Sequence, residues 1–490
     1  MRLFVINIIS FVTVFVFSGC NDKPNDNVLM ADSQPVMEPD YSGVTIPVNI
    51  APMNFVIKEK GVAFYAEISA GSNSVIRIKS RNGLIRIPVK KWENLLETDT
   101  FKDLNIDIFI KEKGEAWKKF RSITNKVSPE TADPFLTYRI LYPGYESWTE
   151  LSIRQRSVQN FNEWNIIKNH VADDNCVNCH SYNNGRSDDF LFHMRGSMGG
   201  TYFFSGDEIK KVNLKTKEMK NSAVYPRWHP SGKFVAFSSN KIVQQFHSAD
   251  NKKVEVSDLE SSLVLYDVEK NEMVPVSFPD MEKYMDTYPE WSPDGKYLYF
   301  CRALQVGDTI DFSQIRYNLL RSAFDSDSRK FGVPETIWDV SSINKSVSFP
   351  RISPDGKYLI ITLHDYGCFP IWHKEADLWS VNLENLQTQP LSLNSNFTDS
   401  YHSWSSNGRW VVFSSRRDDG LTTRLYISYI DDNGKSGKPF ILPQRDPRFY
   451  GRFLKSYNVP EFSQTIIDPV PGKIRKISKS GAIQAKWSFN

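Results

Sequence analysis

The chain has 490 residues, a formal charge of +3, and charged residues at 24% of its positions. This length exceeds one ordinary domain of roughly 150 residues, so two or three domains are expected. The near-neutral charge, with no basic stripe and no nucleic-acid-binding module, argues against a nucleic-acid partner. The aromatic share of 13% favours strands over helices.

The first residues have the pattern of an export signal. A short positive start, Met1-Arg2, precedes an apolar run over 3–17 that is shorter than the roughly 20 residues of a membrane-spanning helix. Ser18-Gly19-Cys20 then resembles the lipobox of bacterial lipoproteins, in which the cysteine is lipidated and becomes the N-terminus. The alternative is a plain secretory signal with an incidental cysteine.

We therefore predict a signal peptide over 1–19, lipidation of Cys20 and a flexible tether over 20–40. The tether would hold the protein at a membrane of the bacterial cell envelope. Asn21 lacks the acidic character that favours retention in the inner membrane, so we expect the outer membrane, with a periplasmic or surface location.

Short runs of alternating apolar and polar residues fill 41–156 and predict a small antiparallel β-sandwich. In the next segment, 157–199, Phe161, Trp164 and Ile167 have helical spacing. This spacing predicts a short amphipathic helix directly before the motif at 176–180.

Residues 200–490 contain an internal repeat. Its four copies share an aromatic residue, usually followed by proline, then a tight turn and an apolar strand: Tyr225 to Lys233, Tyr288 to Lys296, Phe349 to Lys357 and Tyr401 to Arg409. Pro-Asp-Gly suits a tight hairpin turn. The sheet that each copy would form cannot bury both of its faces alone, so it needs a neighbouring sheet on each face. The fourth copy departs from the pattern, with Ser406 for Pro and Asn407 for Asp. The repeat resembles the TolB-type, WD-like β-propeller, which implies five or six blades and a mainly β fold.

The motif Cys176-Val177-Asn178-Cys179-His180 is the CxxCH pattern of covalent haem attachment. Two thiols add to the two vinyl groups, and the imidazole binds the iron. A redox-active dithiol or half of a zinc site are the alternatives. The sequence has no second CxxC and no thioredoxin-like βαβ pattern, so we predict one haem c with His180 as the proximal ligand.

The distal ligand is less determined by the sequence. His193 is the first candidate and Met194 the second, while the ordinary interpretation is a strand histidine and a core methionine. Arg195 could pair with a haem propionate. Export would permit a disulfide between Cys301 and Cys368, but we expect two free, partly buried thiols.

The CVNCHS and FHMRG segments, together with Tyr138, Pro143 to Tyr145, and Phe453 to Asn458, resemble a family of exported lipoproteins. These combine a TolB-like propeller with a single haem motif and are often labelled cytochrome c biosynthesis proteins. The resemblance implies no tested activity.

Three functions follow from these features. The first is a one-haem electron-transfer or redox module whose propeller docks a redox or other protein partner. The second is a propeller binding or sensor protein in which the haem is structural or senses a ligand. A hydrolase ranks last, because no Gly-x-Ser-x-Gly motif is present. Any enzymatic activity is therefore left open.

Overall fold

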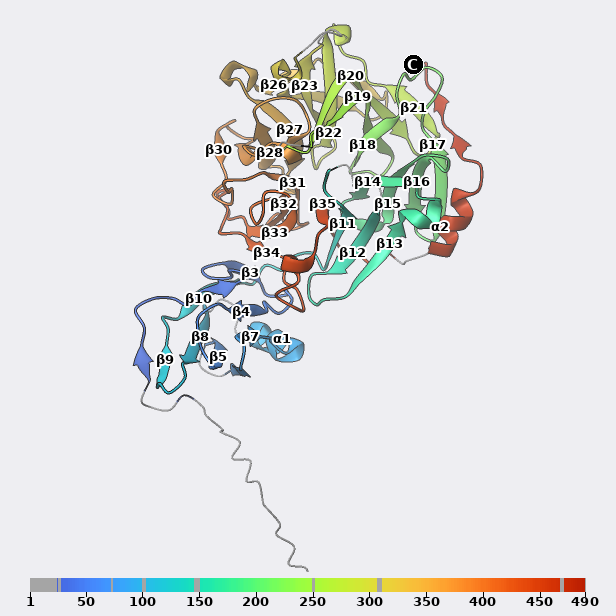
Figure 1. Ribbon diagram of the computed structural model, residues 1–490. Helices are drawn as coiled ribbons and strands as arrows, with labels where there is room; N and C mark the ends of the chain where they lie inside the picture. Colours follow the sequence, from blue (N-terminus) through green and yellow to red (C-terminus); the bar gives the residue numbers. More distant parts are fainter. Residues whose placement is uncertain are drawn as a thin grey trace, which may run out of the picture.

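The computed structural model describes residue 24 and residues 28–71, 74–98, 103–144, 150–248, 252–305, 311–467 and 471–489. In these residues the chain is mainly β, with two α-helices, and it forms a small N-terminal domain beside a large β-propeller (Figure 1). None of their helices has the length and apolar character needed to cross a membrane. The expected signal peptide and Cys20 lie outside the described residues.

The N-terminal domain consists of two packed sheets and one helix, α1 (Val89–Thr98). The larger sheet contains β1 (Leu29–Met30), β9 (Trp117–Lys119), β8 (Asp103–Lys111), β10 (Ile123–Ser128), β3 (Thr45–Pro47), β5 (Ala63–Ala70) and β6 (Ser74–Ser80). The smaller contains β2 (Met37–Glu38), β4 (Phe55–Ile57) and β7 (Leu84–Ile85). Buried side chains of both sheets form one core, as a sandwich requires. Most strand pairs are antiparallel, but β1 with β9 and β3 with β10 are parallel.

Six sheets surround the channel of the propeller, and we number them as blades, with the inner strand first. Blade 1 is β35 (Ser456–Ser463), β11 (Phe135–Leu141), β12 (Ser152–Ser157) and β13 (Glu163–Lys168); blade 2 is β14 (Cys176–Asn183), β15 (Arg186–Arg195), β16 (Gly200–Ser205) and β17 (Glu208–Asn213). Blade 3 is β18 (Ala223–Trp228), β19 (Phe234–Phe246), β20 (Val254–Asp267) and β21 (Glu272–Pro275).

Blade 4 is β22 (Tyr284–Trp291), β23 (Tyr297–Leu304) and β24 (Asn318–Asp325), with β25 (Lys330–Phe331) and β26 (Glu335–Trp338). Blade 5 is β27 (Ser346–Ile352), β28 (Tyr358–His364), β29 (Asp377–Asn382) and β30 (Thr388–Pro390); blade 6 is β31 (Asp399–Trp404), β32 (Trp410–Ser415), β33 (Arg424–Tyr429) and β34 (Phe440–Ile441). The expected propeller is therefore present, and the described sheets give it six blades.

Blade 1 closes the ring with strands from both ends of the propeller sequence. The inner strand β35 comes from the C-terminal region and pairs antiparallel with β11, which directly follows the N-terminal domain. The remaining C-terminal residues, α2 (Pro471–Ser478), β36 (Ile483–Gln484) and β37 (Lys486–Trp487), run along the outside, where β36 pairs with β17 and β37 with β21. Figure 1 shows this tail against the outer edge of the ring.

Three expectations about local structure differ from what is observed. Residues 28–40 already contribute β1 and β2 to the N-terminal domain, so they are not a free tether. The sandwich ends before β11 rather than at Arg156, because β11 and β12 pair within blade 1.

The third difference concerns the segment 157–199, where the predicted helix is wrong. This segment contains β13, β14 and β15, and its helical part is one 3-10 turn over Asn169–Ala172. Pairing of β13 with β12 buries Ile166 and Ile167 between blades 1 and 2, and this tertiary packing outweighs the helical spacing.

The fourth repeat departs from its pattern where the N-terminal domain docks. The backbone N–H of Ser406 donates to Asp133 Oδ2 at 2.7 Å, and its hydroxyl donates to Oδ1 at 2.5 Å. Asn407 Nδ2 donates to the Thr131 carbonyl at 2.8 Å, while its Oδ1 still accepts from Ser405 Oγ as the aspartates of other copies do. Proline could supply neither donor of Ser406, so the departure makes a domain contact possible.

Candidate functional site

Each of the six inner strands has one residue with a positive φ at the same place. These residues are Cys179 (φ 50°), Tyr225 (53°), Tyr288 (52°), Phe349 (52°), Tyr401 (48°) and Val459 (47°). The strand pairing is interrupted at each of them by a shift of register. Such a conformation is costly for residues other than glycine, so its repetition marks a feature imposed by the fold. We call these six residues the channel ring.

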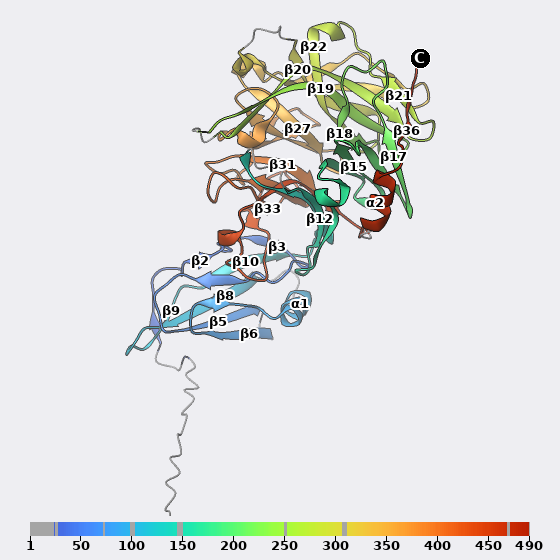
Figure 2. The same ribbon diagram turned by 45° about the vertical axis from the view of Figure 1, so that its right-hand side comes forward.

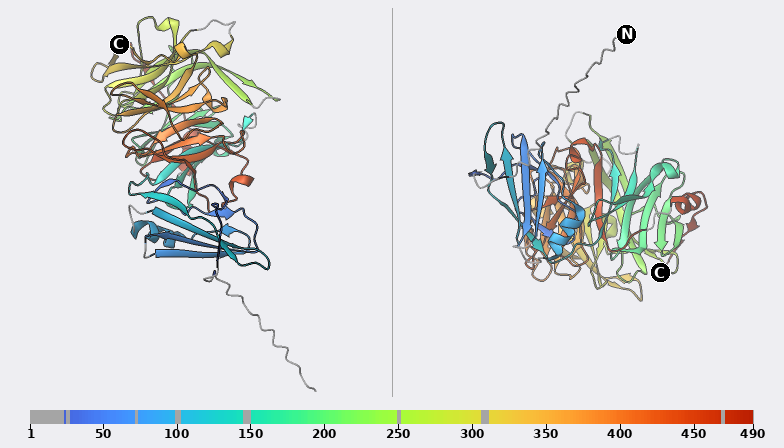
Figure 3. Two further views of the ribbon diagram at one scale, coloured as in Figure 1. Left: turned by 90° about the vertical axis from the view of Figure 1, so that its left-hand side faces the viewer. Right: turned by 90° about the horizontal axis from the view of Figure 1, so that it is seen from below.

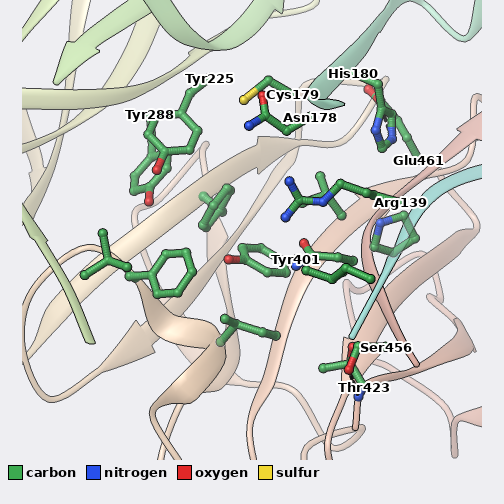
Figure 4. Close-up of a pocket in the computed structure, with 18 of the residues that line it drawn as sticks. Arg139, Asn178, Cys179, His180, Tyr225, Tyr288, Tyr401, Thr423, Ser456 and Glu461 are labelled. Atoms are coloured by element: carbon green, nitrogen blue, oxygen red, sulfur yellow. Dashed lines mark hydrogen bonds and ion pairs between the residues drawn. The ribbon is translucent and has the colours of Figure 1, made fainter. Parts of the chain in front are cut away.

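Four members of the channel ring are aromatic and pack on one another. The ring centroids of Tyr225 and Tyr288 are 4.5 Å apart, those of Tyr288 and Phe349 4.2 Å, and those of Phe349 and Tyr401 4.7 Å. The other two members, Cys179 of blade 2 and Val459 of blade 1, are small. A cavity of about 200 Å³ is lined by all six (Figure 4).

The CxxCH motif is the copy of the propeller repeat that belongs to blade 2. Cys179-His180 takes the place of Tyr225-Pro226 in blade 3 and of Tyr401-His402 in blade 6. Sequence comparison alone missed this equivalence, because blade 2 keeps neither the aromatic residue nor the Ser-Pro-Asp-Gly turn. The sequence signal that could have revealed this repeat is the tight turn at Gly185, which follows the strand of the motif.

Both thiols of the motif are free. Cys179 lines the cavity, whereas Cys176 at the start of β14 packs partly buried against the core between blades 1 and 2. Burial raises the pKa of the Cys176 thiol. A reactive thiol is one whose pKa is lowered, so the surroundings of Cys176 do not favour it as the nucleophile of a redox-active dithiol.

His180 points from the motif toward blade 1 and is fully buried. Burial, together with the positive charge of Arg139, lowers the pKa of His180 to about 3, so the imidazole is neutral. Its Nε2 has no hydrogen-bond partner, and the Glu461 Oε2 atom lies 4.0 Å away.

His402 at the same place in blade 6 provides an internal comparison. Its Nε2 is hydrogen bonded to the Ile360 carbonyl at 2.9 Å, and burial likewise lowers its pKa to about 3. A histidine at this place is therefore compatible with a purely structural role. The two histidines differ in which buried ring nitrogen lacks a partner: it is Nε2 in His180 and Nδ1 in His402.

A network of buried ion pairs lies two residues beyond the channel ring on the inner strands. Glu290 Oε2 is 2.6 Å from Arg227 Nε and 3.3 Å from Arg351 Nη1, and Arg227 Nη1 is 3.1 Å from Glu461 Oε1. These charges join blades 3, 4, 5 and 1 and balance one another. Such fully paired charges serve the structure and leave no net charge for a ligand.

Two other arginines at the cavity are not balanced in this way. Arg139 reaches from β11 into the space between Cys179 and Tyr401 (Figure 4), and its buried Nε has no acceptor. Arg195 at the end of β15 is exposed at the edge of the same cavity. Neither has a carboxylate within ion-pair distance in the described residues.

The two predicted distal ligands are near the motif in the sheet but do not line the cavity. His193 lies opposite Asn178, and its Nδ1 is 3.1 Å from Thr201 Oγ1; burial lowers its pKa to about 3. Met194 is fully buried in the core, where its sulfur is 3.7 Å from the Tyr202 hydroxyl. The structure thus brings Cys179, His180 and Arg195 to the cavity but leaves His193 and Met194 outside.

The donor types of the motif are those that a c-type haem needs, although Cys176 lies outside the cavity that Cys179 and His180 line. Free thiols, a neutral imidazole with an unpaired buried Nε2, and unpaired guanidinium groups are the chemistry that attachment, ligation and propionate binding need. The motif lies on strand β14, and the segment directly before it, where we predicted a short helix, contains β13 and the 3-10 turn over Asn169–Ala172. Among the described residues, no three or more His, Cys, Asp or Glu side chains converge into a metal site.

One hairpin covers the cavity. The outer parts of β19 and β20 extend beyond blade 3 and project from one face of the propeller (Figures 2 and 3). Ile242, Gln244, Val254 and Val256 of this hairpin line the cavity. Lys252 near its tip reaches blade 5, where its Nζ is 2.8 Å from the Tyr366 hydroxyl and 3.1 Å from His373 Nε2.

Cys301 and Cys368 are free, as expected, but they are fully rather than partly buried. They belong to the core of blades 4 and 5 and do not line the cavity.

Comparison with known proteins gives structural likenesses only. No protein-family model and no curated protein matches the chain. A chain of the nidogen/laminin complex matches with a TM-score of 0.39 and 8% identity over 68% of this chain and 100% of its own. A puromycin-hydrolyzing peptidase of Mycobacterium tuberculosis matches with a TM-score of 0.36 and 10% identity over 82% of this chain and 57% of its own. The Dos1 propeller matches with a TM-score of 0.28 and 11% identity over 48% of this chain and 66% of its own. The propeller assignment rests on the sheet order, and no activity is transferred from these proteins.

Proposed function

We propose that this chain is an exported, lipid-anchored haem protein that carries one haem c on Cys176 and Cys179 and acts as a redox module. The observation that carries the proposal is the substitution in blade 2. Where blades 3 to 6 have an aromatic residue followed by proline or histidine, this blade has a free thiol followed by a histidine whose buried Nε2 is unpaired.

The surroundings of the motif support this function. Neutral imidazole is the form that binds iron, and the depressed pKa of His180 keeps it neutral at physiological pH. Aromatic walls and a buried position are suited to a flat, largely apolar group. Bound haem would supply one-electron chemistry, and Cys20 and the propeller face would supply the membrane anchor and partner docking.

The first experiment tests covalent haem. The protein should be produced in a bacterium competent for haem ligation, purified, extracted with acid acetone and examined by haem staining and absorption. We expect a Soret band that stays with the polypeptide. Cys179→Ser should abolish the covalent signal, and Cys301→Ala, which changes a free thiol outside the cavity, should leave it intact.

Protein that is pale in that host, or haem that is fully extracted, would refute the proposal. The ligand is tested separately with His180→Gln and His402→Gln, which change the same place in two blades. Only the first should alter the spectrum. Given the positions of His193 and Met194 outside the cavity, substituting either should leave the ligand field unchanged.

The redox role has its own measurement. A reversible titration with a defined midpoint potential and electron exchange with a quinone or cytochrome pool would support it. A five-coordinate haem that binds carbon monoxide or nitric oxide and exchanges no electrons would instead favour the sensor alternative.

A further inference from the structure

Arg139 is a partly buried cation at the cavity that has no counter-charge within the described residues. Its guanidinium is partly buried, its Nε has no acceptor, and Cys179, His180 and Tyr401 surround it. Removing a cation from water without a counter-charge is costly, so such a group is retained where an anion restores the balance.

The other arginines that line the cavity and are buried have their partners inside the protein. Arg227 and Arg351 share Glu290, and Arg227 also pairs with Glu461. Arg416 stacks on Trp372, with its guanidinium carbon 3.5 Å from the ring centre, and its Nε donates to the Ile371 carbonyl at 2.6 Å. Arg139 therefore stands apart from each of these three.

The walls near Arg139 indicate what kind of anion would enter. Tyr225, Tyr288, Phe349 and Tyr401 offer an aromatic surface of tilted and edge-on rings, and Cys179 and Val459 leave the space beside it. A planar guanidinium binds a carboxylate through two parallel hydrogen bonds, while the aromatic wall favours a flat apolar body.

We propose that the central cavity is a binding site for a carboxylate attached to a flat apolar group, with Arg139 as its specific contact. The carboxylate has two possible sources with the same chemistry: a propionate of haem attached at the motif, or a free aromatic acid that enters beneath the β19–β20 hairpin. The site itself does not depend on haem, because Arg139 is unpaired in the protein alone.

Benzoate titration into two proteins tests the site and separates the sources. One protein is the full chain as isolated, and the other is Cys176→Ser/Cys179→Ser, in which no haem can be attached. Isothermal titration calorimetry should show benzoate binding to the serine variant, with benzamide, the uncharged analogue, binding at least about tenfold more weakly.

Variants of Arg139 in the same serine background identify the contact. Arg139→Gln should weaken benzoate binding by about tenfold or more, and Arg139→Lys should recover it only in part, because lysine lacks the planar fork. Arg154→Gln is the matched control, since Arg154 lies on the neighbouring strand of the same blade and pairs with Glu163 at 2.8 Å. Near-ultraviolet circular dichroism verifies the fold of each variant.

Benzoate binding to the serine variant but not to haem-loaded protein would assign the carboxylate to a haem propionate, and binding to both would assign it to a free acid. Absence of benzoate binding in both proteins, equal binding of benzamide, or unchanged binding in folded Arg139→Gln protein would overturn the site. If the wild-type protein carries no haem, the proposed function is refuted. The binding site at Arg139 is then still tested by the benzoate titration.

Discussion

Blades 3 to 6 and blades 1 and 2 share one backbone but differ in the channel. All six inner strands have the same positive-φ residue and the same break in pairing. Blades 3 to 6 line the channel with aromatic rings that pack at tilted or edge-on angles, whereas blades 1 and 2 present Val459, Cys179 and the unpaired Arg139. The aromatic positions of blades 3 to 6 stabilise the propeller. The positions in blades 1 and 2 that lack an aromatic residue leave room for a ligand.

The largest expected effect tests whether the buried ion pairs of Glu290 stabilise the propeller. Glu290→Gln removes the carboxylate that both Arg227 and Arg351 contact, leaving two buried cations short of a partner. We expect a loss of about 3–5 kcal/mol in the free energy of unfolding, measured by urea denaturation. Glu335→Gln, which breaks an exposed pair with Arg321 in the same blade, should cost less than about 1 kcal/mol. Similar losses in the two variants would contradict the structural role.

A second prediction concerns how the buried His402 makes the stability of the protein depend on pH. Burial lowers the pKa of His402 to about 3, below the ordinary value of 6.5. In the unfolded chain the His402 imidazole therefore becomes protonated below pH 6.5, whereas in the folded chain it stays neutral down to about pH 3. The stability from this residue is complete above pH 6.5 and is lost as the pH falls, by about 2 kcal/mol at pH 5.

Urea denaturation at pH 7.5 and pH 5 measures this difference. In His402→Gln protein the fall in unfolding free energy between these two pH values should be smaller by about 2 kcal/mol than in the unchanged protein. An equal fall in both would show that His402 becomes protonated while the propeller stays folded.

The smallest effect concerns the irregular turn of blade 6. Ser406→Pro restores the pattern of the other repeats but removes both hydrogen bonds to Asp133. We expect the N-terminal domain to be held less firmly, by about 1 kcal/mol, and to be cleaved faster in limited proteolysis. In the background of Asp133→Asn the same substitution should add little, because the two residues share one contact. Additive losses would place the cause elsewhere.

The sequence by itself determined the β-rich composition, the repeat and hence the propeller. Tight turns depend on local chemistry, and Asp294-Gly295 and Asp355-Gly356 form them as the pattern predicts. The CxxCH spacing also identified Cys179 and His180 as candidate residues, since a motif of five residues needs no knowledge of the fold. What these local signals could not give was the conformation around them.

Tertiary structure decided the channel. Helical spacing at Phe161, Trp164 and Ile167 was misleading, because pairing with β12 and burial between blades 1 and 2 outweigh the local preference. Arg139 carries no motif, and it reaches the cavity only because β35, more than 300 residues later in the chain, pairs with its strand and closes the ring. The place of Cys179 in the channel ring is likewise set by the bulge that every inner strand shares. Spacing along the chain identified both thiols, whereas strand pairing placed Cys179 beside an unpaired cation and an aromatic wall.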